Sequence, residues 1–232
     1  MRFDIMTLFP DLVDTILSES IIGRARDAGV IEIRCHNIRD YSEDKHHRVD
    51  DTPYGGGKGM LMAAPPIYNC FKAITADVAQ EDIIHCIYMS PRGRLFDQKI
   101  AQRFSGYDRL VILCGHYEGV DERIIEEIVD EEISIGDYVL TGGEIPACIV
   151  CDATSRLVPG VLSAPECYEN ESFGEESLLE YPQYTRPVDF LGRKVPDVLI
   201  SGHHANIDKW RKEQMNKITC DRRPDLIDKN EK

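Results

Sequence analysis

A chain of 232 residues, 42% of them hydrophobic, can form one large domain or one domain with a smaller companion. Its net charge of −14 argues against a protein whose whole surface binds nucleic acid, and no apolar run is long enough to cross a bilayer. Acidic and polar residues interrupt the start of the chain, where a signal peptide would have its apolar segment, so we expect a cytoplasmic protein.

The negative charge is concentrated in two stretches. Residues 118–132 hold eight acids and one Arg, and residues 165–180 hold six acids and neither Lys nor Arg. Together they contribute −13 of the net −14, so the rest of the chain is nearly neutral. This distribution leaves other faces free to be basic.

In chain order, strand-like and helix-like stretches alternate. Strands are expected over residues 3–9, 30–35, 83–89 and 109–114, and as a run kinked at Gly136 over residues 133–140. Helices are expected over residues 11–18, 65–79, 97–104 and 121–129, and from Glu144 onward. Residues 40–59 form a long polar loop. This alternation predicts an α/β fold with a mostly parallel sheet and helices on both faces.

Glycine-bearing turns follow three of the expected strands, after Met89, Cys114 and Leu140. In parallel sheets, ligands collect beyond the carboxyl ends of the strands, where these turns lie. Glycine there lets another group approach the backbone closely. For the stretch from Ile133 to Pro159, an ordinary strand–turn–helix corner is an equally good interpretation.

The C-terminal part changes character. Residues 161–180 are acidic and lack apolar periodicity, which is typical of an interdomain linker, so we expect one domain over residues 1–160 and a small helical one over residues 181–232. Ser201 is a candidate N-cap for a helix with Ile207, Trp210, Gln214 and Ile218 on one face. From Ser201 onward the net charge is +2, which fits either a solvated amphipathic helix or a nucleic-acid surface.

The eight cysteines are scattered, and several lie inside apolar runs, as buried free thiols of a reducing compartment do. Cys148 and Cys151 have C-x-x-C spacing, but no second pair or paired His follows. One buried face of a helix explains them better than a zinc site.

A glycine-rich loop, Tyr54 to Gly59, resembles a phosphate cradle, although Lys58 is followed by Gly59 and not by the Ser or Thr of a P-loop. The polar residues 45–51 before it could bind a metal, but a mobile loop is the better interpretation. Together, residues 45–58 offer cations and bare backbone N–H groups that suit an RNA backbone.

Five motifs occur in a fixed order along the chain, at residues 54–62, 114–123, 134–146, 155–162 and 178–187. They resemble those of the bacterial tRNA (guanine-N1)-methyltransferases, a family of knotted SPOUT methyltransferases, and the match runs from Phe3 to about Leu226. The resemblance implies a deep trefoil knot, S-adenosylmethionine as methyl donor, and a possible magnesium dependence. It also implies a homodimer that binds the tRNA anticodon stem-loop, with the active site at the subunit interface.

The resemblance also implies which residues bind the ligands. The cofactor pocket would include Tyr88, Met89, Ser90, Pro91, Gly115, Tyr117, Glu118, Gly119, Ile135, Gly136, Tyr138, Leu140, Gly142, Gly143 and Pro146, with Glu118 near the cationic end of the donor. The RNA surface would include Lys45, His46, Arg48, Tyr54, Lys58, Lys209, Arg211 and Lys212. No residues are assigned to a metal.

The implied reaction methylates N1 of the guanosine immediately 3′ of the anticodon. N1 must lose its proton, which moves negative charge onto O6, so the site needs a base near N1 and a cation near O6. Arg156 is the expected cation because its planar charged fork suits that oxygen, although on its own it would be interpreted as a helix-surface ion pair. Glu171 occupies the place where the family usually has the Asp base, and Glu169 is the fallback.

Two other functions remain open. A knotted methyltransferase for another RNA position is disfavoured, because many such relatives lack the 45–58 loop and the C-terminal unit. A non-catalytic RNA-binding protein of the same fold is favoured only by Glu171 in place of Asp.

Overall fold

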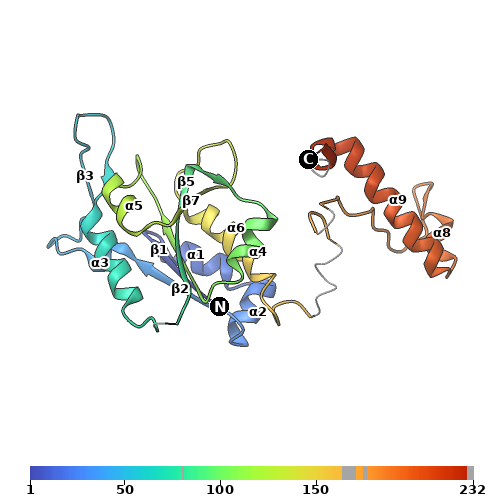
Figure 1. Cartoon of the computed structure of the whole chain (residues 1–232), viewed down its shortest axis with the longest axis horizontal. Coiled ribbons are helices and arrows are strands. Elements are labelled where there is room, and N and C mark those ends of the chain that lie inside the picture. Colours follow the sequence, from blue (N-terminus) through green and yellow to red (C-terminus); the bar gives the residue numbers. More distant parts are fainter. Residues whose placement is uncertain (80, 164–170, 175–176, 229–232) are drawn as a thin grey trace. The chain divides into compact units, whose positions relative to one another are not determined.

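The computed structural model describes residues 1–79, 81–163, 171–174 and 177–228 (Figure 1). The chain divides into two compact units, Met1–Ser163 and Ala164–Lys232, which are described separately below. Among the described helices, none is long and apolar enough to cross a membrane.

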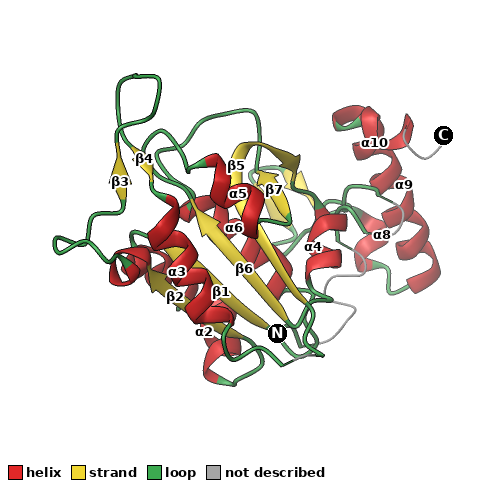
Figure 2. Cartoon of the chain, turned by 60° about the vertical axis from the view of Figure 1, so that its left-hand side comes forward, coloured by secondary structure: helices red, strands yellow, loops and turns green. Residues whose placement is uncertain are grey.

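The first unit is built on a five-stranded sheet in the order β2-β1-β6-β5-β7 (Figure 2). Every neighbouring pair of these strands is parallel, which confirms the predicted parallel sheet. The strands are β1 (Arg2–Thr7), β2 (Glu32–Asn37), β5 (Ile84–Leu95), β6 (Arg109–Cys114) and β7 (Glu131–Ser134).

Helices cover both faces of this sheet. One face packs against α1 (Pro10–Leu17), α2 (Ser20–Asp27), α4 (Gln98–Phe104) and α6 (Glu144–Ser155). The other packs against the 3-10 helix η1 (Ile38–Tyr41), α3 (Ala64–Thr75) and α5 (Glu122–Ile128). The central strand β6 is buried throughout, with Leu110 and Ile112 in one core and Val111 and Leu113 in the other. Burial on both faces explains why this strand is a continuous apolar run.

Three features of the first unit differ from what the sequence predicted. Helix α2 was not predicted, because it buries only a narrow face around Ile22 and Ala25. Strand β5 continues past Met89 to Leu95, through an irregularity in its pairing with β7 between Met89 and Arg94. Residues 135–140 are a loop and not a continuation of β7, because Gly136 adopts a φ of +147°.

The polar loop of residues 40–59 contains a short strand. Strand β3 (Asp50–Asp51) pairs antiparallel with β4 (Leu61–Met62), which lies just beyond the glycine-rich segment. A ladder of two residue pairs has no sequence signature of its own, so the prediction of an unbroken loop was wrong at this point.

The second unit contains a hairpin and three helices in its described part. These are β8 (Asp189–Phe190), β9 (Arg193–Lys194), α8 (Asp197–Ile200), α9 (His204–Arg222) and α10 (Pro224–Asp228). The predicted helical face is confirmed, because Ile207, Trp210, Gln214 and Ile218 on α9 are all partly buried. Ser201 does not cap α9: the N-cap residue is His203, and Ser201 donates to the carbonyl of Val198.

A cluster of charges lies at the amino-terminal edge of the sheet. Arg109 is 6% exposed, and its guanidinium donates to the carbonyl of Ile74 at 2.7 Å and to Asp77 Oδ1 at 3.0 Å. Arg2 donates to the other carboxylate oxygen of Asp77 at 3.1 Å. The hydrogen bond from Arg109, followed by that from Arg2, lowers the pKa of Asp77 to about 2.

This lowered pKa predicts an acid-labile contribution to stability. The ionised Asp77 stabilises the folded state above the unfolded-state pKa of about 3.9, and that contribution disappears as the pH falls toward 2. The urea midpoint of the wild type should therefore fall more steeply between pH 4 and pH 2 than that of Asp77→Asn. Asp27→Asn removes an exposed carboxylate that forms no ion pair within the described residues, so this variant should keep the wild-type slope. Equal slopes for all three proteins would contradict the assignment.

Candidate active site

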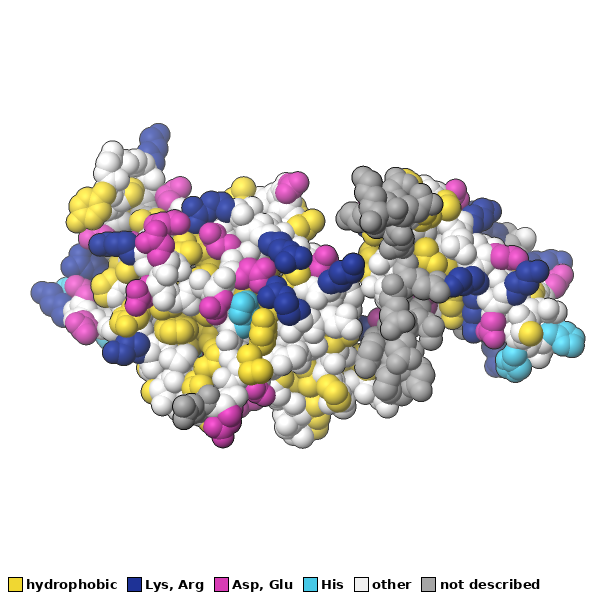
Figure 3. Space-filling view, in the orientation of Figure 1, with side chains coloured by type: hydrophobic (Ala, Val, Ile, Leu, Met, Phe, Trp, Pro, Cys, Tyr) yellow, Lys and Arg dark blue, Asp and Glu magenta, His cyan; other side chains and the backbone are white. Residues whose placement is uncertain are grey.

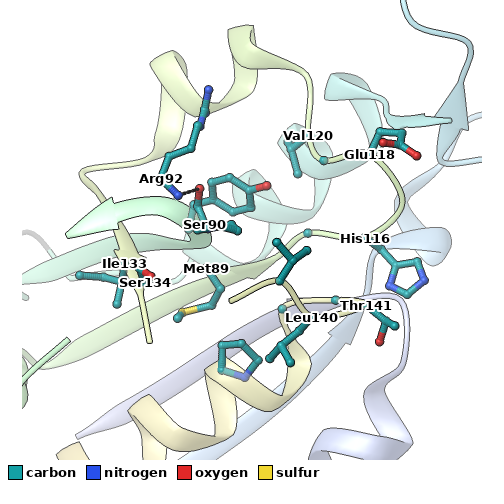
Figure 4. A pocket seen from close by; sticks show the side chains of 18 of the residues that line it. Met89, Ser90, Arg92, His116, Glu118, Val120, Ile133, Ser134, Leu140 and Thr141 are labelled. Carbon is teal, nitrogen blue, oxygen red and sulfur yellow. Dashed lines mark hydrogen bonds between the residues drawn. The ribbon is translucent and has the colours of Figure 1, made fainter. Parts of the chain in front are cut away.

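A cavity of about 600 Å³ lies beside the sheet, where β6 ends, the pairing of β5 becomes irregular after Met89 and the chain leaves β7 (Figure 4). Its lining comes mainly from three segments, residues 88–92, 115–120 and 133–143. Figure 4 shows labelled side chains of all three segments around the same space. The glycine-bearing segments after β6 and β7 therefore meet as predicted, whereas the third segment, residues 88–92, belongs to β5 and is not the predicted turn.

The backbone joins two of these segments directly. The N–H of Gly143 donates to the carbonyl of Gly115 at 2.9 Å, and His116 forms an antiparallel bridge with Gly142. A Cβ on Gly143 would lie 2.8 Å from the Cα of Cys114, closer than real Cβ atoms come. Gly143 is thus required because the start of α6 passes against the end of β6.

The loop after β7 folds back on itself. The N–H of Gly136 donates to Ser134 Oγ at 3.2 Å, and the Tyr138 hydroxyl donates to the carbonyl of Ile135 at 3.3 Å. This leaves Val139 83% exposed beside the cavity, with Tyr138 and Leu140 also exposed. The loop thereby supplies an apolar wall that suits a flat ring.

The charged side chains of the cavity are mostly acidic. Glu118 and Glu122 line it together with Arg92, whose guanidinium donates to Glu122 at 3.2 Å and to Glu132 at 3.4 Å. Burial, together with the charge of Glu132, raises the pKa of the Tyr88 hydroxyl, so the phenol stays neutral. Because the positive charge of Arg92 is already balanced by Glu122 and Glu132, the remaining acid, Glu118, makes the lining favourable to a cationic ligand.

Two buried polar groups support the start of α6. The hydroxyl of Thr7, at the end of β1, donates to Glu144 Oε1 at 2.8 Å, and the N–H of Phe9 donates to the same hydroxyl at 2.9 Å. Glu144 is only 4% exposed and lies in the first turn of α6, where the helix dipole favours a negative charge. This contact holds the helix that carries Pro146 into the cavity wall.

The glycine-rich loop is connected to the cavity through β4. The N–H of Glu118 donates to the carbonyl of Met60 at 3.0 Å, and the N–H of Met62 donates to that of Gly119 at 2.9 Å. A Cβ on Gly59 would lie 2.5 Å from Glu118 Oε1, so the loop packs directly on this acid. Loop and cavity therefore form one continuous structure.

The five predicted RNA-binding residues of this loop are all at least partly exposed to solvent, and Tyr54 is 100% exposed. Arg48 is paired with Asp44 at 3.1 Å. On the face shown in Figure 3, acidic and basic side chains are interspersed over the first unit. On that face, the basic side chains thus form no continuous basic surface.

All fifteen residues predicted to bind the cofactor line the cavity. The sequence interpretation missed several further lining residues. Arg92 directly follows the predicted residues 88–91 and could have been found by extending that segment. Leu61, His116 and Glu122 lie inside the motifs at residues 54–62 and 114–123, which did not show that these side chains reach the cavity. The additional residues are Leu61, Arg92, His116, Val120, Glu122, Ile125, Ile133, Ser134, Val139 and Thr141.

The predicted catalytic residues are not among those that line the cavity. Arg156 follows the last residue of α6, whereas the cavity lies at the first, so one helix length of about 18 Å separates them. Glu171 belongs to the second unit, and Glu169 lies outside the described residues. Within one chain, the structure does not bring Arg156 to the cavity.

The predicted RNA-binding residues of the second unit, Lys209, Arg211 and Lys212, lie on α9. Lys209 is 4.0 Å from Glu213, and Arg211 is 3.5 Å from Asp208 and stacks over the ring of Tyr181 at 4.9 Å. Acidic neighbours therefore balance part of the positive charge of this helix.

The C-x-x-C pair belongs to the hydrophobic core. Cys148 and Cys151 are both buried on the face of α6 that packs on the sheet. Burial raises the pKa of the Cys148 thiol to about 11 and that of Cys151 well above its usual value. Within the part of the chain that the structure describes, no three potential metal ligands cluster.

Comparisons with known proteins agree with the sequence motifs. The model of the family described as "tRNA (Guanine-1)-methyltransferase TrmD" matches residues 1–229. Proteins named tRNA (guanine-N(1)-)-methyltransferase from Ruminiclostridium cellulolyticum and Clostridioides difficile are 56% and 53% identical to this chain. The alignments cover 99% of this chain and 97% of the first relative, and 100% of both chains for the second. The chain therefore belongs to the tRNA (guanine-1)-methyltransferase family.

Proposed function

We propose that this chain transfers a methyl group from S-adenosylmethionine to N1 of the guanosine immediately 3′ of the anticodon in tRNA, in the cytoplasm. As a member of its family, the chain is a tRNA (guanine-N1)-methyltransferase. The observation that carries the proposal is the cavity in which residues 88–92 of β5 meet two glycine-bearing segments, one after β6 and one after β7.

The cavity fits the proposed donor in size and chemistry. Its volume of about 600 Å³ is that of a typical small-molecule site. Ile135 and Leu140 offer apolar contacts to a purine ring, and the backbone of Gly115 and Gly142 offers polar groups to its edge. Glu118, which unlike Glu122 is not paired with Arg92, favours the positive charge of a sulfonium, and that charge makes the methyl group of the bound donor electrophilic.

Two residues of the chain would act on the guanine. Arg156 would donate to O6 and stabilise the negative charge that develops there. Glu171 would accept the N1 proton. Because Arg156 and the cavity lie at opposite ends of α6, we propose that they meet in a dimer, with each site built from two subunits.

An apolar face supports this dimer. Helices α1 and α6 pack side by side, and five large apolar residues on or next to them are between 42% and 45% exposed. These residues are Phe9, Leu12, Ile16, Ile145 and Ile149. Contiguous apolar surface of this kind marks an interaction site, and a second copy of the chain is the occupant that would also bring Arg156 to a cavity.

We also propose the trefoil knot that the family resemblance implies. Supporting this proposal, residues 142 and 143 after β7 bond to residues 115 and 116 after β6, although β5 separates the two strands in the sheet. The segment between β7 and α6 must therefore lead from the edge of the sheet, past β5, to the loop that follows β6.

A methylation assay tests the proposed function. The purified chain is incubated with methyl-labelled S-adenosylmethionine and an unmodified tRNA transcript, and the modified position is mapped by primer extension and mass spectrometry. We expect one label at N1 of the guanosine 3′ of the anticodon, and none on a matched transcript with adenosine there. Adding EDTA tests the magnesium requirement.

Two outcomes would overturn the proposal. A label at another position would indicate a methyltransferase of different specificity. Binding of tRNA and S-adenosylmethionine without any transfer would indicate a non-catalytic RNA-binding protein.

A further inference from the structure

The β8–β9 hairpin of the second unit ends in an exposed apolar tip. Its two-residue turn, Leu191 and Gly192, has φ values of +54° and +80°. Such turns need positive φ at both central positions, where Asn, Asp or Gly is preferred, and Leu191 is strained there by about 1 kcal/mol or more. Asp189 Oδ1 accepts a hydrogen bond from the N–H of Gly192 at 2.9 Å and holds the turn.

Exposure at this tip is unusually high for large apolar side chains. Phe190 is 63% exposed and Leu191 is 86% exposed. A leucine that is both strained and exposed contributes nothing evident to the packing of its own unit. The tip is therefore better explained by contact with another molecule.

The hairpin register places a cation beside the aromatic ring. Phe190 pairs with Arg193, and Asp189 pairs with Lys194. Directly opposite residues of an antiparallel pair project on the same face, with Cβ atoms about 5 Å apart. Phe190 and Arg193 thus present a ring and a guanidinium side by side.

The cations of the hairpin also lack acidic partners. Arg193 and Lys194 are both exposed, and in the described ranges of the chain neither forms an ion pair. The one carboxylate of the hairpin, Asp189, is engaged by the turn. On α9, by contrast, Lys209 and Arg211 have acidic neighbours.

We propose that this hairpin is an RNA-contacting element, in which Phe190 stacks on an unpaired base while Arg193 and Lys194 contact flanking phosphates. The inference rests on the proposed function, which makes an RNA loop the substrate. Stacking of a base on an aromatic side chain contributes about 1–3 kcal/mol, and unpaired cations add salt-dependent affinity without sequence preference. A protein partner would have to supply a carboxylate for each cation, whereas the phosphates of an RNA loop supply negative charge along the whole strand.

Affinity for an unmodified tRNA transcript, measured by filter binding with the full-length protein, tests the proposal. Phe190→Ala should weaken binding by about 5- to 150-fold, and Phe190→Tyr, which keeps a stacking ring, should bind nearly as the wild type does. Replacing both Arg193 and Lys194 by Ala should reduce the slope of log K against log salt by about 1–2. Lys99→Ala, which removes an exposed cation on α4, should leave the slope unchanged.

The outcomes separate this inference from the proposed function. If the wild type binds and methylates tRNA and the hairpin variants match it, the hairpin inference fails and the proposed function stands. If the wild type does not bind tRNA, both fail. If Phe190→Ala instead weakens self-association in sedimentation experiments while RNA affinity is unchanged, the tip is a contact between copies of the chain, which overturns the inference.

Discussion

Gly143→Ala should weaken S-adenosylmethionine binding by about 5- to 150-fold, which corresponds to the ~1–3 kcal/mol that overpacking typically costs. The added Cβ would lie 2.8 Å from Cys114 Cα and 3.0 Å from the N–H nitrogen of Gly115. Both are backbone atoms at the end of β6 and cannot swing aside as a side chain can. Either the start of α6 or the loop after β6 must shift, and both form the cavity wall.

The effect should come from this close approach alone. Gly143 has a φ of −83°, which alanine adopts without strain. Gly106→Ala is the matched control, because a Cβ there meets only the carbonyl of Arg103, at 3.4 Å. Calorimetry should show wild-type cofactor affinity for Gly106→Ala and weak binding for Gly143→Ala; wild-type affinity in both would mean that this corner does not shape the binding site.

The site was predictable from the sequence because its parts lie at strand ends. An apolar run such as residues 109–114 predicts a buried parallel strand, and the glycine that follows it indicates where a ligand can reach the backbone. The alternation of strands and helices along the chain also predicted the parallel sheet. The family resemblance then implied the fifteen cofactor residues, which periodicity alone could not have done.

The remaining features depend on contacts between distant residues. The extension of β5 past Pro91 exists because Gly93 lets the backbone of Glu132 approach to where a Cβ would be 2.4 Å away. Strand β3 exists only because β4 pairs with it, and β4 is itself held by Gly119 and Asp121. Arg156 follows closely in sequence on residues that line the cavity. Helix α6 nevertheless separates it from the cavity in space, and sequence alone does not give the direction of that helix.

Glu171→Gln should lower the single-turnover rate of methyl transfer by about 10²–10⁴-fold, because a carboxamide cannot accept the proton that guanine N1 must lose. Cofactor binding should be nearly unchanged, because Glu171 is not among the residues that line the cavity. Rapid-quench measurement at saturating tRNA separates the chemical step from binding. Glu169→Gln is the matched control in the same acidic segment and should retain most of the rate; the reverse result would assign the base to Glu169.

Mixing two inactive variants tests whether each site is built from two subunits. Gly143→Ala damages the cavity of its own chain, and Glu171→Gln removes the base of its own chain. If the base acts on the cavity of the other subunit, a heterodimer has one intact site, and random pairing restores about one site in four. If the base and the cavity of each site belong to the same chain, no pairing of the two variants restores an active site.

The mixture should be assayed at a cofactor concentration that only an intact cavity binds, after subunit exchange has been confirmed by native mass spectrometry. Recovery of activity would also explain the position of Arg156, since helix α6 would then carry it from the cavity of its own chain toward that of the partner. Full exchange without recovered activity would exclude a site shared in this way, and Arg156 would lose its proposed contact with guanine O6.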